Sequence, residues 1–258
     1  MDYKNIIKEV VDKTCYITIN RPKFLNSLNN ETIHELSHCI KSICEDRKIR
    51  STIITGSENK SFVAGADIKE FTSFNVKQGY DLSKDGHEKL FDLIEHSNKP
   101  FIAAINGFAL GGGLELAMAC HIRLASENAK LGLPEVSLGV IPGYGGTQRL
   151  PRLVGKGIAM EMILSGKMIS AEKALNYGLV NNVCKQEDLI KQCEKIVNSM
   201  NKNSSTAISK AIKAINACYQ DGTNGFNSEI ELFASCFETE DFVEGTNAFL
   251  EKRKPNFN

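Results

Sequence analysis

The sequence predicts an α/β protein whose first half forms a largely parallel sheet and whose C-terminal part is helical. Short apolar runs that favour strands occur at Cys15–Ile19, Thr52–Thr55 and Phe101–Ile105. Between the first two runs, residues Glu31–Glu45 carry apolar side chains at the spacing of a helix with one buried face. Strands that alternate with helices are typical of parallel sheets, whose buried strands are almost continuously apolar. These patterns predict βα units.

The second part of the chain has a different pattern. Strand-like runs almost disappear after Val183. Four hydroxyl residues precede helical stretches in the position of N-caps, namely Thr147, Ser170, Ser204 and Thr239. We therefore divide the chain into an α/β core, residues 1–155, and a helical region, residues 156–258.

The composition is that of an ordinary globular protein, with 42% hydrophobic and 24% charged residues. Lysine plus arginine equals aspartate plus glutamate at 31 each, so no net field attracts nucleic acid or an acidic membrane. The most basic stretch is interrupted by Glu45 and Asp46, and its cations are Lys41, Arg47, Lys48 and Arg50. We therefore expect no nucleic-acid partner, although an RNA-binding or scaffold role is the alternative from a different class.

The cysteines and the N-terminus indicate a reducing compartment. The eight cysteines are scattered, without a CxxC pair or a Cys/His cluster at zinc-finger spacing. The first residues lack the apolar segment of a secretory leader, and no run reaches the ~20 apolar residues of a membrane helix. We expect a cytoplasmic protein with free thiols and no membrane association.

His34-Glu35-Leu36-Ser37-His38 matches the H-E-x-x-H pattern of zinc proteases on a predicted helix. At 100° per residue, both histidines project away from the apolar stripe and toward solvent. A catalytic zinc ion needs a cleft that holds substrate and excludes water, so we expect no metal at this site.

Glycines from Gly111 to Gly113 follow a buried strand and precede an apolar helix that contains Glu115. The first amides of a helix have no intrahelical partners, and glycine lets a ligand approach them closely. Such a turn can hold a developing oxyanion. The residue pattern alone leaves Glu115 open as either a functional carboxylate or a cap on these amides.

Two further segments combine special backbone geometry with candidate functional groups. Residues Ser61–Ile68 contain a Gly-Ala turn that allows close approach of a ligand. Glu135 lies in a loop that is rich in proline and glycine. Taken alone, Glu135 reads either as a surface residue or as a second functional carboxylate.

Together, these segments resemble the crotonase (enoyl-CoA hydratase/isomerase) superfamily almost from end to end. The matching pieces are ITINRPKFLNSL, SFVAGADIKEF, KPFIAAINGFALGGGLELAMACHIRLAS, LGLPEVSLGVIPGYGGTQRLPRLVG and TEDFVEGTNAFLEKR. Their order and the 20-residue step from Glu115 to Glu135 make the resemblance specific. Within the superfamily the chain is most similar to the short-chain members, the 3-hydroxybutyryl-CoA dehydratases.

The resemblance implies roles for individual residues. The amides of Ala66 and Gly112 would form an oxyanion hole, Glu115 and Glu135 would be the catalytic carboxylates, and the Gly143 amide would position the water. Residues that the resemblance places along the acyl-CoA substrate are Lys23, Leu25, Ala64, Ala66, Asp67, Ile68, Gly111, Gly112, Pro134, Tyr144, Phe249 and Lys252. The last two would reach the coenzyme A of a neighbouring subunit.

The resemblance also implies a fold, an assembly and a reaction. The fold would be a β-β-α spiral core with a helical C-terminal region that forms trimers, assembled as a homohexamer. The reaction would be reversible syn addition of water to a crotonyl-CoA-like enoyl-CoA, without a cofactor beyond the coenzyme A of the substrate. An enoyl-CoA isomerase or another CoA-thioester lyase is the alternative. Tyr144, with Phe71 or Phe74, is expected to limit the acyl chain to about four to six carbons.

Overall fold

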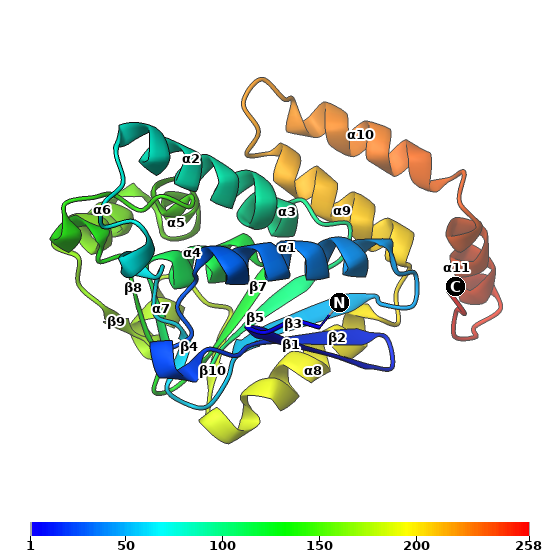
Figure 1. The fold of residues 1–258 in the computed structure, drawn as a ribbon. Helices are drawn as coiled ribbons and strands as arrows, with labels where there is room; N and C mark the ends of the chain where they lie inside the picture. Colours follow the sequence, from blue (N-terminus) through cyan, green and yellow to red (C-terminus); the bar gives the residue numbers. More distant parts are fainter. Residues whose placement is uncertain (1, 258) are drawn as a thin grey trace.

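Two sheets form the centre of the protein in the computed structural model, which describes residues 2–257 (Figure 1). The larger sheet has six strands in the order β1-β2-β3-β5-β7-β10. β1 is antiparallel to β2, and the other neighbours are parallel. The bounds are β1 Ile6–Val11, β2 Thr14–Ile19, β3 Ser51–Gly56, β5 Phe101–Ile105, β7 Ile122–Ser126 and β10 Asn182–Cys184.

The smaller sheet has four short strands in the order β4-β6-β8-β9. The first three are parallel, and β9 is antiparallel to β8. Their bounds are β4 Ser61–Val63, β6 Phe108–Leu110, β8 Lys130–Gly132 and β9 Ile169–Ser170.

The chain repeatedly passes from the larger sheet to the smaller one and then into helices. β3 continues into β4, β5 into β6, and β7 into β8, and each pair is followed by helical segments. These repeats are the turns of a β-β-α spiral, so the predicted fold class is confirmed. The sequence did not predict β6. It predicted that a glycine turn would join the buried strand directly to the helix.

Helices cover both sheets and continue to the C-terminus (Figure 1). The α-helices are α1 Asn30–Glu45, α2 Val76–Gly86, α3 Asp92–Glu95, α4 Gly112–Ala119, α5 Gly146–Val154, α6 Lys156–Ser165, α7 Ala171–Asn176, α8 Leu189–Met200, α9 Ser205–Ala217, α10 Gly225–Cys236 and α11 Glu240–Leu250. A π-helix, η3 His87–Phe91, joins α2 to α3. The 3-10 helices are η1 Pro22–Phe24, η2 Ile68–Glu70, η4 Glu135–Leu138 and η5 Gln186–Asp188. No helix within residues 2–257 is long and apolar enough to cross a membrane.

The elements predicted from the clearest sequence patterns are present in the structure. The expected strands are confirmed as β2, β3 and β5, and the first expected helix is α1. Ser170, Ser204 and Thr239 are N-caps whose side chains accept backbone hydrogen bonds. The prediction that Thr147 caps a helix is wrong, because α5 begins at Gly146 and Thr147 is its second residue. Gly145 takes the N-cap position with a φ of 97°, which glycine adopts without steric cost.

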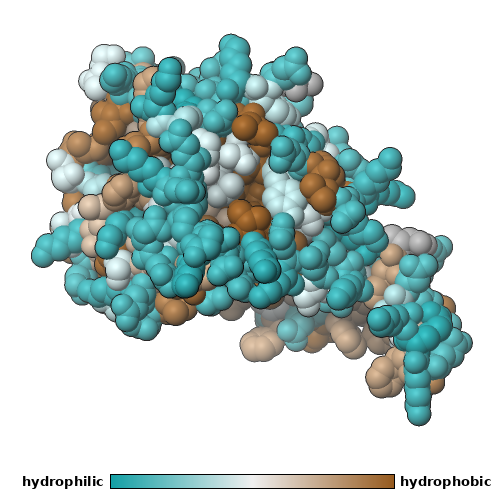
Figure 2. Space-filling model, turned by 90° about the horizontal axis from the view of Figure 1, so that it is seen from below, coloured by the Kyte–Doolittle hydropathy of each residue, from teal (hydrophilic) through white to brown (hydrophobic). Residues whose placement is uncertain are grey.

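The C-terminal helices extend away from the sheets. α9 packs along α10, and α11 lies at the far end of the molecule (Figure 1). Seen from below, a segment protrudes from the body at the right edge, and hydrophilic residues cover most of the face around small apolar patches (Figure 2). β9 and β10 both follow residue 155 and pair with strands that precede it. The division of the chain at residue 155 stays a prediction.

The central helix α4 is buried along its whole length. Its sequence GGLELAMA is apolar on every side except for Glu115, so this helix holds a carboxylate inside the protein. Gly113 lets α4 approach β4 closely, because a Cβ atom at this position would lie 2.0 Å from the carbonyl oxygen of Val63.

We predict that Gly113→Ala lowers the free energy of unfolding by roughly 1–3 kcal/mol, because α4 must move away from β4 to admit the methyl group. Gly157→Ala is the matched control. Gly157 lies in α6 with no atom within 4 Å of an added Cβ, so alanine is expected to raise stability by about 0.5–1 kcal/mol. Urea denaturation at one protein concentration measures both changes. Equal stability of the two variants would contradict the close approach.

Candidate active site

The carboxyl ends of three neighbouring strands meet at one cavity. Ala66 follows β4, Gly112 follows β6 and Glu135 follows β8. Because β4, β6 and β8 are parallel neighbours, the segments that leave them lie at the same edge of the small sheet. All three residues line a cavity of about 370 Å³. The order of strands therefore brings together groups that are far apart in sequence.

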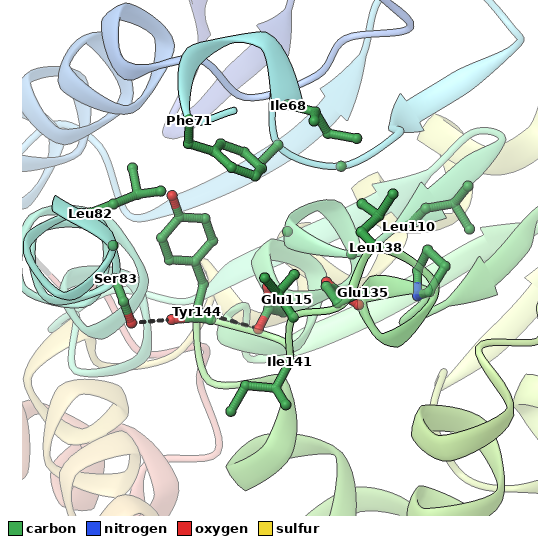
Figure 3. A pocket seen from close by; sticks show the side chains of 18 of the residues that line it. Ile68, Phe71, Leu82, Ser83, Leu110, Glu115, Glu135, Leu138, Ile141 and Tyr144 are labelled. Carbon is green, nitrogen blue, oxygen red and sulfur yellow. Dashed lines mark hydrogen bonds between the residues drawn. The ribbon is translucent and has the colours of Figure 1, made fainter. Parts of the chain in front are cut away.

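Apolar side chains form most of the cavity wall (Figure 3). They come from η2 and the residue after it, α2, β6, η4 and the segment 140–144, and include Ile68, Phe71, Leu82, Leu110, Leu138, Ile141 and Tyr144. Ile68, Leu138 and Ile141 are among the exposed large apolar residues of the protein. The cavity thus opens to solvent through an apolar rim, which suits a ligand with an apolar portion.

Two backbone amides lie close together where α4 begins, at the wall of the cavity. Gly112 is the first residue of α4, so its amide has no intrahelical acceptor and carries the positive end of the helix dipole. A Cβ atom on Gly112 would lie 3.6 Å from the amide nitrogen of Ala66. Within residues 2–257, neither amide donates a hydrogen bond to the protein. The pair is therefore available to an oxygen atom of a ligand.

Glu115 projects from α4 into the base of the cavity, with 1% of its surface exposed. Its Oε1 accepts hydrogen bonds from the amides of Tyr144 and Gly146, both at 2.8 Å. The carboxylate therefore binds the loop before α5 and the first residue of α5 rather than the amides at the start of its own helix, which rules out the local-cap alternative. Burial raises the pKa of Glu115 above its usual range, and the two amide hydrogen bonds oppose that rise.

Glu135 lies beside Glu115 (Figure 3). Burial and then the charge of Glu115 raise its pKa to about 7. Its Oε2 atom is buried and has no hydrogen-bond partner within residues 2–257. An unpaired buried oxygen costs free energy unless a ligand or water satisfies it, so Glu135 is not an ordinary surface carboxylate.

Gly111 makes room for this arrangement. Its φ of 50° and ψ of −126° belong to a region that is essentially restricted to glycine. A Cβ atom here would also lie 2.7 Å from Oε1 of Glu135. The turn into α4 and the position of the second carboxylate thus require the same residue.

Tyr144 closes one end of the cavity. Its ring stacks on Phe91 with a centroid distance of 4.7 Å and lies close to Phe71 and Leu82 (Figure 3). Gly86 admits the ring, because a Cβ atom on Gly86 would lie 2.2 Å from it. Other predicted residues that line the cavity are Ala64, Ile68, Phe74, Gly111, Pro134 and Gly143.

Some predicted residues lie outside the cavity of this chain. The carboxylate of Asp67 forms an ion pair with Arg21 at 3.0 Å and so braces the Ala66 loop. The carbonyl oxygen of Leu25 accepts a hydrogen bond from the Ala64 amide, which joins its segment to the same loop. Lys23 is exposed. Phe249 and Lys252, at the end of α11 and just beyond it, are exposed too, and their contact with a neighbouring subunit stays a prediction.

The H-E-x-x-H helix is arranged as its periodicity predicted. His34 and His38 are exposed on α1, whereas Glu35 is buried. Both oxygens of Glu35 accept hydrogen bonds from the amides of Lys4 and Asn5, so this carboxylate holds the N-terminal segment.

Sequence reasoning missed two residues that hold the loop of residues 143–145, which leads into α5. Arg149 donates to the carbonyl oxygen of Tyr144 at 2.8 Å and forms ion pairs with Asp92 and Glu95. Ser83 donates to the carbonyl oxygen of Gly143 at 2.6 Å. A single buried arginine or a serine in an exposed helix has no distinctive sequence pattern, so only the structure reveals these contacts.

A comparison with protein families shows which family the chain belongs to. Residues 9–258 match the family described as Enoyl-CoA hydratase/isomerase. The chain belongs to this family. Relatives named as crotonyl-CoA or enoyl-CoA hydratases match almost the whole chain.

Three relatives illustrate the similarity. A crotonyl-CoA hydratase from Syntrophomonas wolfei is 45% identical and is matched over 100% of this chain and 99% of its own length. A short-chain-enoyl-CoA hydratase from Clostridium acetobutylicum is 46% identical over 98% of this chain and 97% of its own length. The crystal structure of an enoyl-CoA hydratase from Bacillus anthracis superposes with a TM-score of 0.93 at 39% identity, covering 98% and 99% of the two chains.

We predict that Glu115→Gln lowers the pKa of Glu135 from about 7, because the neighbouring negative charge is removed. Burial, the larger cause, keeps that pKa above 4.5. Infrared titration of the protonated carboxyl band measures the change. Glu127→Gln, which alters an exposed carboxylate outside the cavity, is the control and should leave the titration near pH 7 in place. An unchanged titration in Glu115→Gln would show that the two carboxylates are not coupled.

Proposed function

We propose that the protein is a short-chain enoyl-CoA hydratase that reversibly adds water to crotonyl-CoA and similar trans-2-enoyl-CoA thioesters. Family membership and the names of the relatives from S. wolfei and C. acetobutylicum support this assignment. The observation that carries it is the convergence of two neighbouring carboxylates and two unpaired amides on one apolar-walled cavity.

The two amides suit the charge that forms during hydration. Addition of water to the double bond builds negative charge on the thioester oxygen as an enolate develops. The N–H groups of Ala66 and Gly112 would donate to that oxygen without rearranging, and the dipole of α4 would add to their effect. Donors of this kind contribute roughly 3–4 kcal/mol each in well-studied enzymes.

The surroundings of the two carboxylates favour different proton roles. Two amide donors to Oε1 stabilise the ionised form of Glu115, which suits a base that takes a proton from water. Glu135 has no such donors to Oε2, and its pKa of about 7 keeps much of it protonated at neutral pH. Glu135 would therefore give the proton to C2 while water, activated by Glu115, attacks C3. Dehydration reverses both transfers.

The Gly143 amide is a suitable donor for the reacting water. It lines the cavity and makes no hydrogen bond to the protein within residues 2–257. The water would then be held by this amide and the two carboxylates, which fixes its oxygen relative to the double bond.

The segments at Lys23 and Ala64 would contact the coenzyme A portion of the substrate, which is the only coenzyme that the reaction needs. Exposed apolar side chains on α10 and α11, including Phe233 and Phe249, support assembly into a homohexamer whose neighbours share a binding site.

All eight cysteines are free thiols, which supports a reducing cytoplasm.

We predict that Glu115→Gln and Glu135→Gln each lower kcat for crotonyl-CoA hydration by at least ~10²-fold, because each removes a proton-transfer group without changing side-chain size. The assay follows loss of the enoyl-thioester absorbance and identifies the product. Glu127→Gln, an exposed change of the same type, should keep wild-type turnover. Near-normal activity in a folded Glu115→Gln or Glu135→Gln variant would refute the site assignment, and a product with a shifted double bond but no added water would identify an isomerase.

We predict that kcat/KM is at least ~10-fold higher for crotonyl-CoA than for a ten-carbon enoyl-CoA, because Tyr144 blocks the end of the cavity next to Phe71. Tyr144→Ala should narrow this preference, since the backbone N–H that serves Glu115 is retained while the ring is removed. Steady-state kinetics over a series of chain lengths measures the effect. Equal wild-type values for the two substrates would reject Tyr144 as a length barrier.

A further inference from the structure

Ser83 connects the outer wall of the cavity to the catalytic loop. It lies near the end of α2, whose start is held by a capping box between Asn75 and Gln78. The Ser83 hydroxyl donates a hydrogen bond of 2.6 Å to the carbonyl oxygen of Gly143 (Figure 3). This bond is of the shorter kind for hydroxyl donors.

The accepting oxygen belongs to the peptide group that serves Glu115. The carbonyl of Gly143 and the N–H of Tyr144 form one planar unit, and in a trans peptide they point in opposite directions. Ser83 binds its oxygen, and Glu115 binds its hydrogen through Oε1 at 2.8 Å. Figure 3 shows the two hydrogen bonds on either side of this peptide. The peptide is thus clamped between a helix of the wall and a buried carboxylate.

The clamp acts on a segment with few other restraints. Gly143 has no side chain, and its own amide makes no hydrogen bond within residues 2–257. Arg149 holds the next carbonyl, that of Tyr144, and therefore fixes the following peptide rather than this one. Rotation of the Gly143–Tyr144 peptide would turn the Tyr144 N–H away from Glu115.

We propose that Ser83 is a positioning residue that acts on Glu115 through the Gly143–Tyr144 peptide, both by fixing the peptide plane and by strengthening its N–H as a donor. A hydrogen bond to a carbonyl polarises the peptide, so the N–H on its far side becomes a better donor. The inference rests on the proposed hydratase function, because Glu115 is the base in that reaction.

Several charged groups around Glu115 stay in place when Ser83 is changed. Glu135 on η4 adds a like charge, whereas Arg149 on α5 and His87 on η3 face Glu115 as positive or potentially positive groups. The Gly146 amide also remains as a donor. Weakening of the Tyr144 N–H bond alone raises the pKa of Glu115, so the base ionises at higher pH.

The test compares Ser83→Ala with Ser83→Thr, which keeps the hydroxyl, in the full-length protein. Ser83→Ala is expected to lower kcat for crotonyl-CoA about 5- to 10-fold, with KM changed less than about 2-fold. The acidic limb of its kcat/KM profile should move to higher pH, because the ionised base is lost earlier as pH falls. Ser83→Thr should restore most of kcat and the position of that limb.

Ser165→Ala is the matched control. Ser165 is exposed on α6 and donates a 2.6 Å hydrogen bond to the carbonyl oxygen of Glu161, so the same chemical change occurs outside the site. Melting temperatures of all variants show whether a loss of activity follows unfolding.

Wild-type kcat and an unmoved pH profile in folded Ser83→Ala would overturn the proposal, as would a loss that affects KM alone. A loss of kcat that Ser83→Thr does not restore would also overturn it, because the hydroxyl would not be the group responsible. Failure of the proposed function is distinguishable, since in that case the wild-type protein and Ser165→Ala would themselves fail to hydrate crotonyl-CoA.

Discussion

The site depends on one constraint of the backbone, the parallel alignment of the three short strands β4, β6 and β8. Each strand has only three residues, yet each ends at the same edge and releases one functional group there. Ala66, Gly112 and Glu135 come from three separate passes of the chain. If the small sheet lost its register, no local rearrangement of a loop could bring these groups back to one cavity.

Burial of Glu115 is the main energetic cost of this arrangement. A carboxylate inside an apolar helix loses hydration, and the protein offsets that loss with the amides of Tyr144 and Gly146 and the nearby guanidinium group of Arg149. The Oε2 atom of Glu135, by contrast, has no hydrogen-bond partner within residues 2–257. The pKa of both carboxylates is therefore raised, although the groups that surround each of them differ.

Sequence patterns predicted the long elements but could not predict the local geometry that decides function. Phe101–Ile105 is long and apolar enough to be recognised as a strand, whereas three-residue strands such as Phe108–Leu110 carry too short a pattern. The sequence left two roles possible for Glu115, a cap on the first amides of its helix or a functional carboxylate, because the role depends on where the carboxylate points. That direction is set by the loop at Tyr144, 29 residues further along the chain. The prediction that Glu115 and Glu135 are a catalytic pair therefore rests on the resemblance to a known family rather than on periodicity.

Tyr144 takes part in the site through two separate sets of atoms. The backbone N–H binds Glu115, and the side chain fills the end of the cavity in the space that Gly86 leaves open. Every amino acid except proline supplies that N–H. The side chain at this position can therefore be exchanged to fit a different ligand while the hydrogen bond to Glu115 is kept. The hydrogen bond to Glu115 is thus independent of the side chain at position 144, whereas the space at this end of the cavity depends on it.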